Sequence, residues 1–207
     1  MARLNSIDDL RKIIAEPRPT TFKKILDALD EQSIDFLKRC PFALVGTTSK
    51  DGTVEVSPKG DEPGFIRVVD PKTLLIPERI GNNLAFGLSN VIANGQIGLL
   101  ALVPATGETL RISGTAEVFD DPDLVQSLST LGKPALLATR VHIKHCYFHC
   151  ARSILRANLW KPEAWPAPGR ISFGKIIAPR VDAGQDFAEK IDASVAGSYK
   201  DRLWSNT

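Results

Sequence analysis

Three pairs of short apolar segments, each joined by a tight turn, constrain the fold of this chain more than any other feature of its sequence. FALVGTT and TVEVS flank Ser49-Lys50-Asp51-Gly52, in which Asp-Gly is typical of a β-hairpin turn. GFIRVVD and TLLIP flank Pro-Lys, and GQIGLLALV and ETLRISGTAEVF flank PATG. Many short strands joined by tight turns are typical of a small antiparallel barrel. The sequence therefore predicts six antiparallel strands between residues 42 and 119.

Helical patterns flank these strands, so the predicted fold class is mainly β with flanking helices (α+β). Residues 6–40 are predicted to be helical, because Ser6 and Asp9 resemble a capping box and an apolar stripe runs over residues 22–29. DPDLVQSLSTLGK is a further predicted helix, capped by Asp121. The predicted parts are an N-terminal helical extension (1–40), the barrel domain (41–161) and a C-terminal extension packed on the barrel or on a partner subunit (162–207).

Charge and composition exclude several classes of function. The 26 Lys and Arg residues against 24 Asp and Glu leave a net charge of +2, which gives no electrostatic reason to expect nucleic-acid or membrane binding. No apolar run approaches the roughly 18 residues of a membrane span. The start MARLNSIDDLRK turns polar too early for a signal peptide. Three cysteines do not suggest a disulfide framework, so we expect a cytoplasmic protein.

The stretch TRVHIKHCYFHC (139–150) contains all three histidines and raises the question of a metal site. On a helix, His142, His145, Cys146, His149 and Cys150 would share one face, and such ligands suit zinc. However, β-branched and aromatic residues dominate this stretch and favour a seventh strand. Successive side chains of a strand point to opposite faces, so the five would not converge. We therefore predict no metal site, with zinc as the alternative.

PERIGNNLAF (77–86) has the composition of an anion-binding site. Arg79 comes directly after a predicted strand, and Asn82 or Asn83 can cap the helix predicted over residues 82–95. The free amides and the dipole of a helix N-terminus favour an anion, and an arginine adds a charged contact. Alternatively, this is an ordinary capped helix with an exposed arginine.

VSPKGDEPGFIRV is the second candidate segment, since Ser57, Lys59 and Arg67 place two cations near a strand end. Alternatively, it is a polar loop between two hairpins. The adjacent carboxylates Asp61 and Glu62 are interpreted as solvated side chains of a turn. The sequence contains no nucleophile elbow, no Gly-rich nucleotide loop and no serine–histidine–aspartate set, so catalytic residues stay unassigned.

The order of these segments resembles the pyridoxamine 5'-phosphate oxidase-related family of FMN-binding split barrels. VSPKGD and IPERIGNN, followed by ETLRISG and an HC…LW segment, carry the resemblance, which covers roughly residues 35–161. Two features depart from the family pattern. Leu84 stands where relatives often have a basic residue, and the C-terminal tail lacks the Arg-x-His motif of enzymes that oxidise pyridoxamine phosphate.

The family resemblance implies a six-stranded antiparallel split barrel that forms a homodimer, with FMN bound in clefts at the subunit interface. It assigns the phosphate and ribityl chain to Arg67, Arg79, Asn82 and Asn83, the flavin cleft to Ser57 and Lys59, and further contacts to Pro77, Arg111 and Trp160. Arg111 would contact the flavin from the neighbouring strand or from the other subunit.

The function implied by the resemblance is that of an FMN-dependent oxidoreductase acting on a small substrate, with NAD(P)H as one possible partner. The cofactor would carry the electron chemistry, which explains why no catalytic side-chain set is visible. Two alternatives stay open: a non-catalytic binding protein for FMN, haem or a deazaflavin, and a metal protein using the histidine–cysteine stretch.

Overall fold

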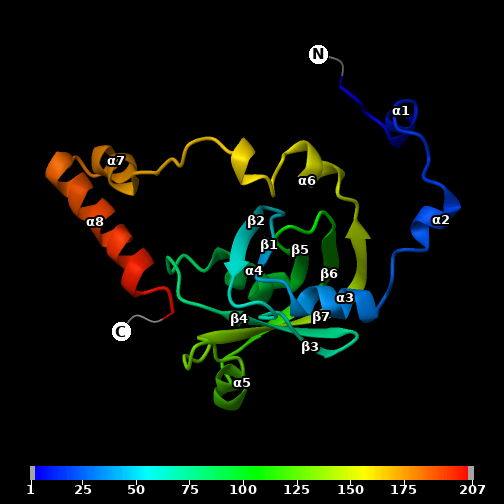
Figure 1. Cartoon of the computed structure of the whole chain (residues 1–207), viewed down its shortest axis with the longest axis horizontal. Helices are drawn as coiled ribbons and strands as arrows, with labels where there is room; N and C mark the ends of the chain where they lie inside the picture. The colour runs from blue at the N-terminus through cyan, green and yellow to red at the C-terminus, as the bar shows by residue number, and fades with distance from the viewer. Residues whose placement is uncertain (1–2, 205–207) are drawn as a thin grey trace.

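The computed structural model describes residues 3–204, and one seven-stranded antiparallel sheet forms its centre (Figure 1). The order of the strands is β2-β1-β5-β6-β7-β4-β3. The strands are β1 (Phe42–Thr48), β2 (Val54–Gly60), β3 (Arg67–Asp70), β4 (Thr73–Glu78), β5 (Gln96–Leu102), β6 (Thr109–Phe119) and β7 (Leu137–His149). The predicted fold class and the three hairpins are confirmed. The sheet has seven strands rather than six, because the histidine-rich stretch joins it as β7, as its residue pattern indicated.

The helices are short except for the last one. They are α1 (Ile7–Arg11), α2 (Pro19–Phe22), α3 (Glu31–Lys38), α4 (Phe86–Asn94), α5 (Pro122–Ser127), α6 (Arg152–Arg156), α7 (Phe173–Ile177) and α8 (Gln185–Asp201), with 3₁₀ turns η1 (Pro162–Ala164) and η2 (Ala178–Arg180). The predicted caps at Ser6 and Asp121 are confirmed, since each accepts a hydrogen bond from a first-turn amide. None of the described helices is long and apolar enough to cross a membrane.

Two predicted helices are shorter than their patterns suggested. The stripe over residues 22–29 leaves the helix after Phe22, and Leu26 instead exchanges backbone hydrogen bonds of 2.9 and 2.8 Å with Cys146. The helix predicted from residue 82 begins only at Phe86, because Asn83 and Ala85 have positive φ angles of 61° and 53°. The first difference is a long-range backbone pairing and the second a left-handed backbone conformation, and the apolar pattern reports neither.

The hydrophobic core fills the inside of the curved sheet. Alternation along β1 buries Ala43, Val45 and Thr47, as expected for a strand with one face on the core. Leu37 of α3 is fully buried in the same cluster. A smaller cluster under α5 contains Leu75, Leu128, Ala135 and Ala138.

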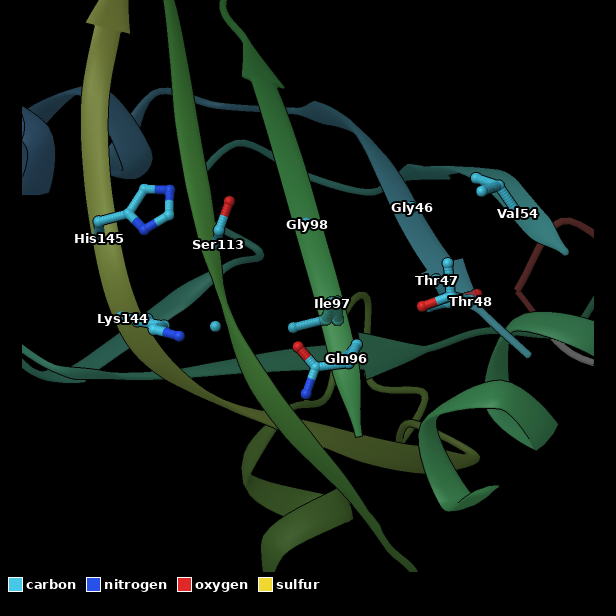
Figure 2. Close-up of a pocket in the computed structure, with 11 residues that line it drawn as sticks. Gly46, Thr47, Thr48, Val54, Gln96, Ile97, Gly98, Ser113, Lys144 and His145 are labelled. Atoms are coloured by element: carbon cyan, nitrogen blue, oxygen red, sulfur yellow. The ribbon is translucent and has the colours of Figure 1, made fainter. Parts of the chain in front are cut away.

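The outer face of the sheet has a shallow groove of about 310 Å³. Gly46, Gly98, Ser113 and His145 lie directly opposite one another on β1, β5, β6 and β7. Opposite residues of antiparallel strands share a face. Figure 2 shows the Ser113 and His145 side chains beside the two glycines, which leave the sheet surface bare.

The edge strand β2 exposes its apolar side chains and partly buries its polar ones, which is the reverse of the usual pattern. Val54 and Val56 are exposed on the outer side, whereas Glu55, Ser57 and Lys59 are partly buried on the other side. A strand that faces a core normally buries its apolar residues. The inner side of β2 is therefore built for a polar environment.

The C-terminal segment forms a small helical unit of its own. Figure 1 shows α7 and α8 next to each other and apart from the sheet. The amide of Gly174 donates to Asp192 Oδ1 at 2.9 Å, and a Cβ at Gly174 would lie 1.9 Å from the Ala188 carbonyl oxygen. The absence of a side chain at this glycine therefore lets the two helices approach closely.

Candidate functional site

A cavity of about 690 Å³ opens between β2, β4 and the loop that leads into α4. Its wall includes side chains of the core, namely Val45, Phe65, Ile76, Val91 and Ile97. Ligand sites are typically concave, mostly apolar and roughly 300–1,000 Å³ in volume. The same cavity is lined by six of the predicted site residues, which are Ser57, Lys59, Pro77, Arg79, Asn82 and Asn83. The structure thus brings two separate sequence motifs to one place.

Lys59 and Glu78 form an ion pair across the open side of the barrel. They lie on β2 and β4, which are not neighbours in the sheet, so this side-chain contact links two strands that no ladder joins. Glu78 is buried, and its second oxygen, Oε1, accepts a hydrogen bond of 2.9 Å from Thr139 Oγ1. Lys59 Nζ donates to Glu78, and among residues 3–204 no other acceptor engages this ammonium group, which has three donors. Its remaining donors are therefore available to a ligand in the cavity.

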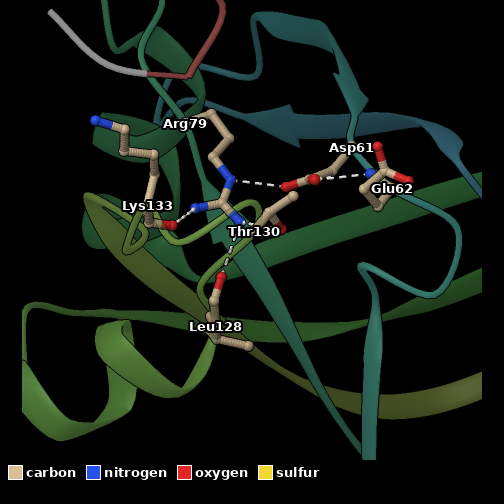
Figure 3. A network of polar contacts seen from close by, with 6 residues as sticks. All are labelled: Asp61, Glu62, Arg79, Leu128, Thr130 and Lys133. Atoms are coloured by element: carbon tan, nitrogen blue, oxygen red, sulfur yellow. Dashed lines mark hydrogen bonds and ion pairs between the residues drawn. The ribbon is translucent and has the colours of Figure 1, made fainter. Parts of the chain in front are cut away.

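Arg79 is the most heavily bonded side chain at the cavity, and Figure 3 shows its contacts. Its Nε donates to Asp61 Oδ2 at 2.7 Å, and its terminal nitrogens donate to Leu128 O and Thr130 Oγ1 at 2.8 Å and to Lys133 O at 3.4 Å. The side chains of Arg79 and Asp61 are only 11% and 1% exposed. Arg79 therefore ties the end of β4 to the end of β2 and to the turn after α5.

The loop between β4 and α4 forms the remaining wall of the cavity. Asn82 Oδ1 accepts a hydrogen bond of 3.1 Å from the amide of Leu84, which holds the loop in a tight turn. Ala85 occupies the N-cap position and supplies no side-chain cap to α4. The first amides of a helix lack partners within the helix, so those of α4 are available to an acceptor. The predicted capping by Asn82 or Asn83 is wrong, because both residues precede the N-cap.

Three predicted site residues do not line this cavity within the described chain. Arg67 is exposed on β3, where it pairs with Leu75. Arg111 is exposed on β6, and its Nη1 donates to the Tyr147 hydroxyl at 3.3 Å. Trp160 Nε1 donates to the Thr106 carbonyl oxygen at 2.8 Å. Their predicted contacts with a cofactor are therefore not made from within this cavity by the same chain.

Sequence reasoning missed the two carboxylates that define the charge of the site. The interpretation of Asp61 as a solvated turn residue is wrong, because it is buried against Arg79, while its neighbour Glu62 is exposed. Glu78 was passed over within the motif IPERIGNN. The one available signal was position, since Asp61 directly follows β2, which carries Lys59, and Glu78 ends β4 directly before Arg79.

The cysteine of the histidine-rich stretch is a core residue. Cys146 is fully buried, and its thiol donates to the Ala28 carbonyl oxygen at 3.3 Å. Burial raises the pKa of Cys146 to about 11, so the thiol is protonated at neutral pH and poorly suited to hold a metal. Among residues 3–204, no three His, Cys, Asp or Glu side chains are placed so that they could hold a metal ion.

His149 belongs to a group of aromatic and cationic side chains on the outer face of the sheet. Its ring centroid lies 5.2 Å from that of Tyr147, and Lys24 Nζ lies 5.4 Å from the Tyr147 centroid. Burial lowers the pKa of His149, and the nearby charges of Arg111 and Lys24 lower it further. Its Nε2 atom is buried without a hydrogen-bond partner in the described residues.

Comparison with known proteins identifies the family. The family model described as pyridoxamine 5'-phosphate oxidase matches residues 29–150, which is more than half of the chain. A search of curated proteins found no match.

Solved structures with a similar fold include three bacterial proteins. HupZ from Group A Streptococcus is 18% identical, with a TM-score of 0.47 over 58% of this chain and 93% of that one. A general stress protein 26-related protein of Clostridium acetobutylicum, from the pyridoxinephosphate oxidase family, is 15% identical (TM-score 0.45; 59% and 91% covered). An FMN-binding protein of Syntrophomonas wolfei is 8% identical (TM-score 0.46; 69% and 95% covered). Similarities of this size identify neither a ligand nor an activity. The match over residues 29–150, together with the antiparallel sheet, shows that the chain belongs to the pyridoxamine 5'-phosphate oxidase family.

Proposed function

We propose that this chain is a flavin-dependent oxidoreductase that holds the flavin ring in the cavity between β2, β4 and α4. The proposal rests on the combination found there: a cavity of about 690 Å³ with core side chains in its wall and one lysine that a buried glutamate holds at its edge. A large flat ring needs an apolar slot and a few polar contacts at its edge. Membership of the family supports flavin, and FMN is the form that the sequence predicts.

The residues of the chain would bind and orient the cofactor rather than react. Lys59 would donate hydrogen bonds to the ring edge, where negative charge accumulates on reduction, and Glu78 with Thr139 would hold its ammonium group in place. The Ser57 hydroxyl and the free amides at the start of α4 would supply neutral donors. The bound flavin itself would supply hydride and electron transfer. The substrate would be a small molecule or NAD(P)H.

We also propose a homodimer in the cytoplasm, with the outer face of the sheet as the contact surface. The exposed apolar side chains of Val54, Val56 and Phe42 on that face support the dimer, since exposed apolar patches commonly mark protein contacts. The three cysteines are all free, which fits a reducing compartment.

Flavin uptake and turnover test the proposed function in two steps. Purified protein, saturated with FMN and desalted, should retain the two visible absorbance bands of oxidised flavin and release them on denaturation. NAD(P)H added without oxygen should then bleach those bands. Failure to retain any flavin would contradict the proposal. Retention without bleaching by NAD(P)H or other donors would favour the alternative of a non-catalytic binding protein, and haem and a deazaflavin would be titrated in parallel.

A further inference from the structure

The charged side chains around the cavity give it no excess of positive charge. Its lining contains the cations Lys59 and Arg79 and the carboxylates Glu55 and Glu78, and Asp61 lies directly behind Arg79. Two cations thus stand against three carboxylates. A site built to attract a phosphate dianion normally presents an excess of positive charge.

Arg79 cannot turn toward a ligand without breaking hydrogen bonds that it makes within the protein. Four hydrogen bonds commit its guanidinium to Asp61 and to the turn after α5. Asp61 is 1% exposed, so withdrawal of Arg79 would leave a buried carboxylate without its partner. Such an unpaired buried charge is strongly unfavourable. Arg79 therefore forms part of the cavity wall, and its charge is paired with Asp61 rather than with a ligand.

Lys59 keeps free donors, but its charge is matched by Glu78 at direct contact. The contact crosses from β2 to β4, and Glu78 is itself held by Thr139. Since Glu78 is buried, it cannot exchange Lys59 for water. A ligand at this wall meets a neutral pair with hydrogen-bond donors, which suits the polar edge of a ring better than a dianion.

The loop where an anion would meet the start of α4 contains no charged side chain. Residues 80–86 read IGNNLAF, and Leu84 and Phe86 are 57% and 54% exposed there. This loop can bind a phosphate only through backbone amides and asparagine side chains, because it contains no cation. Contacts between neutral groups are weaker than charge-assisted ones.

We infer that the cavity recognises the flavin ring and barely distinguishes the phosphate, so that riboflavin and FMN bind with similar affinity. This inference rests on the proposed function and names the ligand class of the same site. A single charge-assisted contact to a phosphate would raise affinity by roughly tenfold or more. Without such a contact, FMN gains little over riboflavin.

Direct titration tests this inference. The flavin-free protein is titrated with riboflavin and with FMN, and binding is followed by flavin fluorescence in low and moderate salt. The two dissociation constants should agree within tenfold, and salt should affect both alike, since no charged contact is screened. FMN binding that is more than tenfold tighter and falls with salt would overturn the inference, and would indicate a cation from a second copy. Binding of neither flavin would instead defeat the proposed function, and the inference with it.

A variant with an added charge tests where the phosphate group of bound FMN lies. Leu84→Arg places an unpaired guanidinium in the exposed loop before α4, and Ile92→Arg adds the same charge to α4 outside the cavity lining, where Ile92 is 76% exposed. Leu84→Arg should tighten FMN binding at least tenfold without changing that of riboflavin, and Ile92→Arg should change neither. An unchanged ratio of the two affinities in Leu84→Arg would refute the placement of the phosphate at this loop.

Discussion

Arg79 and Lys59 were both predicted to contact a cofactor, and the two side chains now have different roles. Lys59 faces the cavity with free donors, whereas Arg79 uses its guanidinium on Asp61, Leu128, Thr130 and Lys133. Each cation is paired with a buried acid, Lys59 with Glu78 and Arg79 with Asp61. The difference is that three further hydrogen bonds hold the terminal nitrogens of Arg79 on the protein. A cation in a motif can thus contact a ligand only through donors that the protein leaves free.

The structural role of Arg79 leads to a stability prediction. Arg79→Met keeps much of the volume but leaves Asp61 buried without a countercharge, which should lower the free energy of unfolding by about 3–5 kcal/mol. Urea unfolding would measure it. The double variant Arg79→Met with Asp61→Asn should recover a large part of the loss, because no buried charge remains. If Arg79→Met instead unfolds like the parent and loses only FMN binding, Arg79 is a phosphate ligand as the sequence first suggested.

At the scale of elements, local patterns predicted the strands well and the start of α4 badly. The hairpins and β7 follow from alternation and turn residues, which act within a few positions. The start of α4 depends on left-handed backbone at Asn83 and Ala85. Asparagine adopts this conformation more readily than most residues, but alanine gives no sign of it. The acidic partners of the two cavity cations were missed for a related reason. The pairs Lys59–Glu78 and Asp61–Arg79 join strands far apart in sequence, so no local pattern encodes them.

The left-handed N-cap of α4 gives a prediction of stabilisation. Ala85 has a φ of 53°, which a residue with a Cβ adopts at a cost. Ala85→Gly removes that strain, although it also gives the unfolded chain more freedom, so the net gain should be at most about 1 kcal/mol. This gain corresponds to a rise in Tm of up to roughly 2–4 °C for a chain of this size, measurable by calorimetry. Ala85→Val should lower Tm. A lower Tm in Ala85→Gly would show that the conformation is not strained.

At the scale of the whole molecule, two observations support the proposed homodimer. β2 turns apolar residues outward and polar residues toward the cavity, and Arg67, Arg111 and Trp160 do not line the cavity of their own chain. A second copy packed on the outer face of the sheet would cover Val54 and Val56. It would also place the exposed Arg111 at an interface.

Gly98 gives a direct test of this dimer. It lies mid-strand on the outer face, and a Cβ built there meets nothing closer than the Ile112 carbonyl oxygen at 4.0 Å, so the fold has room for a side chain. Gly98→Glu should leave the circular dichroism spectrum unchanged but place an unpaired charge in a dry contact, which dimers do not tolerate. Light scattering after gel filtration should show a dimer for the parent and a monomer near 22.6 kDa for the variant.

The matched control for this test is Gln126→Glu, which adds the same charge on α5, where Gln126 is exposed. It should stay dimeric. If the cavity is shared between copies, monomeric Gly98→Glu should also bind flavin more weakly than Gln126→Glu does. A monomeric parent would refute the dimer. A monomeric Gly98→Glu that binds flavin with the parent's affinity would show instead that each cavity is complete within its own chain.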